Sequence, residues 1–263
     1  MIPFTKAHAY GNDFLYALEE HVVGRELDQL ARALCDRHAG VGADGLVVYG
    51  RTPDGAAMRL LNADGSPSEV SGNGVRGLAA ILLRSDDRDD VDVVVHTAAG
   101  DKRLRRTERT GTRQTFVAAM GLPHELRQVA ADVAGERLDL VVMDFGNPQC
   151  VTLGELPDAA RFQRLGPAIE RHELFPARTN VEFASVEDPR TVRILIWERG
   201  VGPTLSSGTG SCASLIAAVA YGGAEKAARV IAPGGTQEVE WREDSVYLTG
   251  WAEVLIDGIW LRD

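Results

Sequence analysis

The chain has 263 residues, of which 44% are hydrophobic and 25% charged, with a formal net charge of −10. This is the composition of a globular protein, folded as one large domain or as two lobes. The negative charge argues against nonspecific nucleic-acid binding, which needs a basic surface. The N-terminus does not read as a signal peptide, no apolar run approaches a membrane span, and three widely spaced cysteines make neither a disulfide framework nor a metal site. We therefore expect a cytoplasmic protein.

Short runs of β-branched residues predict strands, and apolar residues at helical spacing predict helices between them. In chain order, helices are expected at 27–35, 75–83, 162–171 and 212–221. Strands are expected at 45–49, 58–61, 91–96, 115–119, 138–145, 191–197 and 245–248. The helices at 75–83 and 212–221 are apolar on nearly all sides, which predicts that each lies inside a core.

An internal repeat relates the two halves of the sequence. At an offset of 136 residues, the Ser-Gly-x-Gly motif at 71–74 aligns with the one at 207–210. The first motif begins nine residues after Asn62 and the second nine residues after Glu198, and both of these polar residues stand at the end of an expected strand. A second pair, Gly-Asn at 11–12 and at 146–147, fits nearly the same offset. The sequence thus predicts two copies of one unit, residues 1–118 and 119–263.

Each copy places a glycine-rich turn at the start of a buried helix. Such a turn presents unpaired backbone N–H groups that, with the helix dipole, bind an anion. Phosphate and carboxylate are the two candidate anions. Neither turn has the sequence pattern of a nucleotide-binding loop, which leaves a carboxylate as the alternative to phosphate. Ser71 and Ser207 would then flank the α-carbon of that ligand from two sides, as stereoinversion requires.

A purely structural interpretation of the same residues is also open. Serine is a favoured helix N-cap. The asparagines after glycine, Asn12 and Asn147, are typical of turns. Glu198 and Arg199 could form a surface ion pair that contributes little to stability. They stand, however, at the end of a strand and before a glycine-rich loop, where functional sites are often built.

Taken together, the motifs resemble those of one known family, the diaminopimelate epimerases. In order they are AHAYGNDF at 7–14, GVGADG at 40–45, NADGS at 62–66, EVSGNGVR at 69–76, GNP at 146–148, TNVEF at 179–183, ERGVG at 198–202 and SGTG at 207–210. The resemblance runs in order from residue 4 to about 254. The pair Glu198-Arg199 favours this branch over the related proline racemases.

The resemblance implies an α/β (α+β) fold of two pseudo-symmetric halves, each a curled, mostly antiparallel sheet around a central helix. It implies an isomerase that inverts one carbon of diaminopimelate by a two-base mechanism, without metal or pyridoxal phosphate. Ser71 and Ser207 fall on the two catalytic positions. Carried over by position, the substrate-binding residues would be Asn12, Asn62, Asn147 and Asn180 for polar groups, Glu198 and Arg199 for the distal end, and Gly72, Asn73, Gly208 and Thr209 in the carboxylate-binding turns.

This chain departs from the family pattern at the catalytic positions, where the family carries cysteine at both 71 and 207. Further departures are Gly77 for cysteine, Gln149 for histidine and Trp251 for proline. A serine hydroxyl is a far weaker acid than a thiol and needs an adjacent base. The candidate bases are Glu69, Asp13, Asp44 and His8.

Three interpretations follow for the function. The first is epimerisation of LL-diaminopimelate to meso-diaminopimelate, for lysine and peptidoglycan precursors, in a site adapted to serine. The second is a related isomerase or lyase acting on another amino acid. The third is a binding protein for an amino acid that has lost catalysis. All three predict a small amino-acid ligand and no nucleic-acid or membrane partner, and all are compatible with a homodimer.

Overall fold

A computed structural model of the chain describes residues 1–68 and 70–262. The chain divides into two compact units, the first from Met1 to Ala118 together with the residues from Gly250 onward, and the second from Ala119 to Thr249. This division differs from halves at 1–118 and 119–263 only at the C-terminal end. The difference arises because the last strand pairs with the first, in a register that places Ile2 opposite Trp260.

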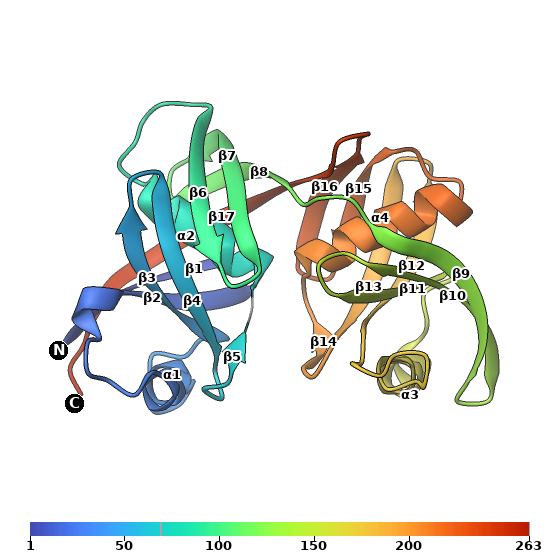
Figure 1. Cartoon of the computed structure of the whole chain (residues 1–263), viewed down its shortest axis with the longest axis horizontal. Helices are drawn as coiled ribbons and strands as arrows, with labels where there is room; N and C mark the ends of the chain where they lie inside the picture. Colours follow the sequence, from blue (N-terminus) through green and yellow to red (C-terminus); the bar gives the residue numbers. More distant parts are fainter. Residues whose placement is uncertain (69, 263) are drawn as a thin grey trace. The chain divides into compact units, whose positions relative to one another are not determined.

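In unit 1, strands enclose one helix (Figure 1). The pairing runs β1–β2–β3–β4–β6–β7–β8–β17 and returns to β1, with β2–β3 and β4–β6 parallel. The strands are β1 (Ile2–Ala9), β2 (Asn12–Leu18), β3 (Gly45–Thr52), β4 (Gly55–Asn62), β5 (Pro67–Ser68), β6 (Val91–Thr97), β7 (Gly100–Thr110), β8 (Arg113–Ala119) and β17 (Val246–Trp260). The helices are η1 (Glu19–His21), α1 (Leu27–Cys35) and α2 (Gly72–Leu82).

Unit 2 repeats the same order of elements. Its strands are β9 (His124–Val133), β10 (Glu136–Asp144), β11 (Pro148–Leu153), β12 (Asn180–Asp188), β13 (Thr191–Glu198), β14 (Gly202–Thr204), β15 (Ala227–Ala232) and β16 (Gly235–Trp241). Its helices are α3 (Ala159–Glu170) and α4 (Gly208–Tyr221). The pairs β11–β12 and β13–β15 are parallel, as are β2–β3 and β4–β6 in unit 1. The repeat predicted from the motifs is therefore a repeat of topology.

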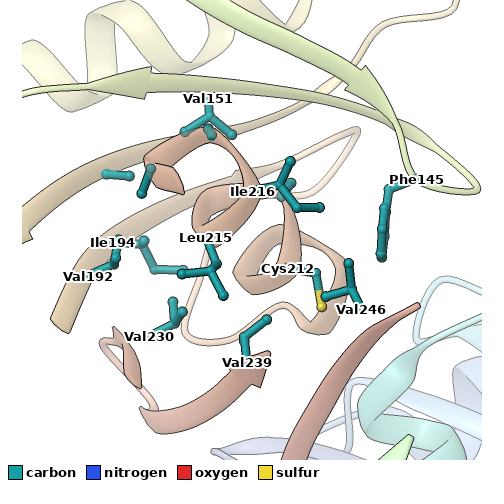
Figure 2. Packing of buried hydrophobic residues seen from close by; sticks show 14 of the residues in the cluster. Phe145, Val151, Val192, Ile194, Cys212, Leu215, Ile216, Val230, Val239 and Val246 are labelled. Atoms are coloured by element: carbon teal, nitrogen blue, oxygen red, sulfur yellow. The ribbon is translucent and has the colours of Figure 1, made fainter. Parts of the chain in front are cut away.

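Both nearly all-apolar helices lie in cores, as their sequences predict. Helix α2 contacts β1, β2, β4, β6 and β7, and α4 contacts β11, β12, β13, β15 and β16. Around α4, Leu215 lies toward Ile194 and Val230 of the surrounding strands, and Cys212 lies beside Val246 (Figure 2). Burial on all sides explains why neither helix has a polar face.

The other predictions of secondary structure place elements correctly and miss several strands. Every helix and strand expected from the sequence corresponds to a helix or strand of the structure. The strands not predicted are β1, β2, β5, β7, β9, β11, β12, β14, β15 and β16, and β17 is much longer than the expected 245–248. None of the described helices has the length and apolarity that crossing a membrane would require.

A fully buried arginine caps the C-terminal end of α2. The Arg106 guanidinium donates to the carbonyl oxygens of Leu83 (2.8 Å), Asp86 (2.6 Å) and Arg88, and to Gln114 Oε1 (2.9 Å). A cation at this end is favoured by the helix dipole, and the carbonyls there lack helical partners. Arg106 thus fixes the end of α2 and the loop that leads to β6.

Replacing Arg106 by methionine should lower the free energy of unfolding by about 3 kcal/mol, because buried carbonyl oxygens lose their donors. The matched control is Arg105→Met, on the same strand, whose side chain is exposed and paired with Asp92 at 3.0 Å. Urea denaturation should show a large fall in midpoint for the first variant and little change for the second. Equal midpoints for the two variants would contradict this role of Arg106.

Candidate active site

The two serines occupy the same local position in their units. Ser71 is the N-cap of α2, and its Oγ accepts a hydrogen bond from Gly74 N at 3.2 Å. Ser207 is the N-cap of α4, and its Oγ accepts from Gly210 N at 3.1 Å. Both side chains are half-buried. The capping interpretation is therefore confirmed for each serine, and it leaves the hydroxyl proton of each free to be donated to another acceptor.

Around the first turn, a polar network brings together two of the predicted substrate-binding residues. Asn73 Nδ2 donates to Asn12 Oδ1 at 3.2 Å, and Asn12 Nδ2 donates to Asp44 Oδ2 at 2.7 Å. Behind them, Arg76 donates to Asn73 Oδ1 at 2.5 Å. Asn62 is exposed at the end of β4 and bonds instead to Ser66 Oγ at 2.9 Å.

None of the described candidate bases forms a hydrogen bond with Ser71. Asp13 pairs with Lys6 at 2.8 Å and Arg37 at 2.7 Å. Burial acts to raise the pKa of Asp13, but the hydrogen bonds from Arg37 and Lys6 outweigh it and hold the pKa below the usual value. Asp44 is bound to Arg37 and Asn12, and His8 lies edge-on to Trp251. The fourth candidate, Glu69, lies outside the described residues.

The departures at 77 and 251 have local explanations in unit 1. A Cβ at Gly77 would lie 2.0 Å from the Tyr16 hydroxyl oxygen, so this tyrosine fills the space of a side chain. The same hydroxyl donates to Gly74 O at 3.0 Å, which supports the first turn of α2 from behind. Trp251 donates from its backbone N to Tyr10 Oη at 3.1 Å, and its ring packs against the Tyr10 ring at a tilt of 41°.

The second turn rests on a buried polar pair that the sequence analysis did not assign. Gln149 and Glu182 are 1% and 0% exposed. With the Gln149 amide oriented to satisfy its neighbours, its nitrogen donates to both carboxyl oxygens of Glu182, at 3.1 and 3.2 Å. Its oxygen then accepts from Thr209 Oγ1 at 3.2 Å and faces the Asn147 amide at 2.6 Å. The predicted residues Asn147 and Thr209 are thus brought together through Gln149.

Glu182 has an altered acidity. Burial raises its pKa well above the ordinary value, and the nearby charge of Glu198 raises it further. A sequence signal for Glu182 exists, since it is a charged residue within the otherwise apolar run from Val181 to Phe183. Such a residue is either paired or functional, because burying an unpaired carboxylate is costly.

The loop carrying Glu198 and Arg199 is held by two buried side chains. Asn180 Oδ1 accepts from the backbone N of Arg199 at 3.0 Å. The carboxylate of Glu170, 2% exposed, accepts from Gly200 N at 3.0 Å and from Trp197 Nε1 at 2.9 Å. Asn180 is therefore placed to orient the loop, and Glu170 is a further positioning residue that the sequence analysis missed.

The cysteines do not stand in for the missing thiols. Cys35, Cys150 and Cys212 are all buried. Burial raises the pKa of the Cys150 thiol, with a further contribution from Glu182, and raises that of Cys35 to about 12. Cys212 packs in the core around α4 (Figure 2). Within the described part of the chain, no group of three or more His, Cys, Asp and Glu side chains is arranged to hold a metal ion.

The fold is that of a class of proteins built from two topologically equivalent α/β halves, each with a helix inside its strands. A crystal structure of a probable proline racemase from Agrobacterium radiobacter K84 superposes with a TM-score of 0.76, at 20% identity, covering 100% of this chain and 94% of that one. At this identity the likeness shows the fold alone.

The sequence comparisons identify the family within this class. The diaminopimelate epimerase family model matches residues 4–126 and 141–255. The chain is 40% identical to a diaminopimelate epimerase of Desulfitobacterium hafniense, covering 98% of each chain. It is 41% identical to one of Desulforudis audaxviator, covering 98% of this chain and 99% of the relative. The chain belongs to the diaminopimelate epimerase family.

Two glycines at equivalent positions should respond in opposite ways to alanine. A Cβ at Gly210 would lie 2.5 Å from Glu182 Oε1, whereas one at Gly74 would have its nearest contact at 3.5 Å. We expect Gly210→Ala to lower the free energy of unfolding by about 1–3 kcal/mol through overpacking. Gly74→Ala should leave it unchanged or raise it by up to about 1 kcal/mol, because alanine favours the helix. Urea denaturation of both variants measures the difference, and equal effects would contradict the packing described for Glu182.

Proposed function

We propose that the protein interconverts LL- and meso-diaminopimelate without a cofactor, inverting one α-carbon by proton removal and return. The observation that carries the proposal is the family membership over nearly the full chain, with both Ser-Gly-x-Gly turns present. The turns begin buried helices, and each offers backbone N–H groups to a carboxylate. Supply of lysine and peptidoglycan precursors is the role that this activity serves.

The residues around the turns take distinct parts in the proposed reaction. Gly72, Asn73, Gly208 and Thr209 bind the carboxylate beside the reacting carbon, and Asn12, Asn62, Asn147 and Asn180 bind further polar groups. Ser71 and Ser207 exchange protons with the α-carbon, one removing and the other returning. The charge that develops near the carboxylate is stabilised by the N–H groups and by the two helix dipoles.

Recognition of the distal end falls to Glu198 and Arg199, a carboxylate and a guanidinium suited to an ammonium and a carboxylate group. Their loop is fixed through hydrogen bonds to Asn180 and Glu170. Binding energy at an end that does not react orients the substrate and favours an amino acid with two charged ends.

Arg199→Lys should raise KM for diaminopimelate by about tenfold or more while kcat changes little. Lysine keeps the charge but loses the planar fork that binds a carboxylate through two hydrogen bonds. Steady-state kinetics measures both constants. A large fall in kcat at unchanged KM would place Arg199 at the reacting carbon and contradict its distal role.

The principal test follows the α-proton directly. LL-diaminopimelate incubated with the protein in deuterated water should lose its α-proton NMR signal as the meso isomer forms. Ser71→Ala and Ser207→Ala should each abolish formation of the meso isomer. Absence of exchange by the wild-type protein at high enzyme concentration, with substrate bound, would reject the epimerase proposal.

Restoring cysteine at both positions should increase the rate. A thiol is far more acidic than a hydroxyl, and a helix N-terminus stabilises the thiolate. We expect the double variant Ser71→Cys, Ser207→Cys to turn over at least about tenfold faster than the wild type. A slower double variant would show that the site is built around serine.

Binding of an amino acid without turnover is the second candidate function. It is favoured by the hydrogen bonding of the serines, because each accepts only from its own turn among the described residues, with no carboxylate or histidine bonded to either hydroxyl. Line broadening of diaminopimelate signals without exchange, together with activity in the double cysteine variant, would identify this function.

The proposal includes a cytoplasmic location and a small-molecule amino acid as the only required partner, with no nucleic acid. Three buried, widely spaced cysteines suit a reducing compartment. A homodimer is compatible with it, and sedimentation at several protein concentrations measures that state.

A further inference from the structure

We propose that Glu182 is the proton-exchange partner of Ser207, so that the carboxyl group accepts the serine's hydroxyl proton as Ser207 takes a proton from the substrate. This inference rests on the proposed epimerase function for its substrate. The geometry that supports it lies entirely within unit 2.

Glu182 points at the turn that carries Ser207. The position of a Cβ on Gly210 would lie 2.5 Å from Glu182 Oε1 and 3.0 Å from Ser207 Oγ. The two oxygens are therefore at most about 5.5 Å apart, the sum of those two distances. Only the absence of a side chain at Gly210 allows the carboxyl group to approach so closely. A side-chain rotation or one water molecule can close the remaining gap.

The surroundings of Glu182 keep its proton affinity high. Burial raises its pKa, and the Glu198 carboxylate on the neighbouring strand β13 adds to the effect. On the other side, β11 contributes the buried Cys150 thiol, whose own pKa is raised, and the neutral Gln149 amide. A carboxylate whose pKa is raised is a stronger base when it is ionised, as the uptake of a hydroxyl proton requires.

In unit 1, Phe14 takes the equivalent place beside the turn. The nearest side chains to a Cβ on Gly74 are those of Ser71 itself and of Phe14, at 3.8 Å. The two turns share backbone, cap and helix, yet the nearest atom to a Cβ on Gly210 belongs to a carboxyl group, whereas the three nearest to a Cβ on Gly74 belong to Ser71 and Phe14. Because of this difference, the proposal assigns the removal of the substrate's α-proton to Ser207.

The proposed proton transfers conserve both protons and charge. The α-carbon–hydrogen bond breaks and its proton goes to Ser207 Oγ, while the original hydroxyl proton of Ser207 moves to the Glu182 carboxylate and the electron pair stays on the α-carbon. Ser71 then donates its hydroxyl proton to that carbon and takes a replacement from water. Glu182 releases its proton to water, and the cycle closes without net gain or loss.

The first test is Glu182→Gln, which preserves shape and burial but cannot take up a proton. We expect kcat for diaminopimelate to fall by about a hundredfold or more with KM little changed, and the acidic limb of the pH–rate profile to disappear. The matched control is Glu187→Gln on the same strand, an exposed residue paired with Arg193. Glu182→Asp should retain part of the rate that Glu182→Gln loses, together with the acidic limb of the pH–rate profile. A Glu182→Gln protein with wild-type kcat and pH profile would overturn the inference.

A second test needs no turnover and so separates this inference from the proposed function. The thiol introduced by Ser207→Cys is alkylated with iodoacetamide over a range of pH, with Glu182 present or changed to Gln. We expect the midpoint, the pH at which alkylation reaches half its maximal rate, to differ by about one pH unit or more between the proteins with Glu182 and with Gln at that position, because neighbouring groups titrate together. The thiol introduced by Ser71→Cys should keep its midpoint in both. An unshifted midpoint at position 207 would reject the pairing even if the wild type proved to be an epimerase.

Discussion

The structure depends on one constraint, the enclosure of an apolar helix whose first N–H groups must still find acceptors. Helices α2 and α4 lie in cores and cannot turn a polar face to water. Their N-terminal ends present unpaired backbone N–H groups, and a serine caps each one. Whatever binds in these turns meets a donor set fixed by the core behind it. The chemistry is therefore held by rigid elements rather than by mobile loops.

The parts of this design that depend on local pattern could be predicted from the sequence. The run from Cys212 to Tyr221, in which Ser214 is the main polar exception, predicts a buried helix, and two like motifs at one spacing indicate two like units. Other elements could not be predicted because polar and apolar residues do not alternate in them in a regular pattern. Strand β7 is mostly charged, and one of its inward-facing residues, Arg106, is itself charged. The pairing of β17 with β1 joins the two ends of the chain, which no local signal reports.

The candidate site was predictable where it follows motifs, and not where it depends on neighbours in space. Asn12 and Asn73 are distant in sequence but are brought into contact, whereas Asn62 bonds within its own turn. Glu182 sits inside a motif named from the sequence, yet its significance comes from the close approach to Gly210. Two copies of one unit have thus kept their backbone while their buried side chains have diverged, with Phe14 beside one turn and a carboxyl group beside the other.

The closing of unit 1 by β17 bears on how the protein forms during synthesis. Most of unit 1 leaves the ribosome first and β1 can pair with β2 at once, but β1 must wait for Val254 to Trp260 before it gains its second partner. Unit 2 is continuous in sequence and can complete its strand pairing earlier. Contacts between such distant residues slow folding, since a long loop must close before they form. Unit 1 is therefore translated first but completes its strand pairing last. Until then, the edge of β1 that β17 will cover is exposed and open to pairing with other chains.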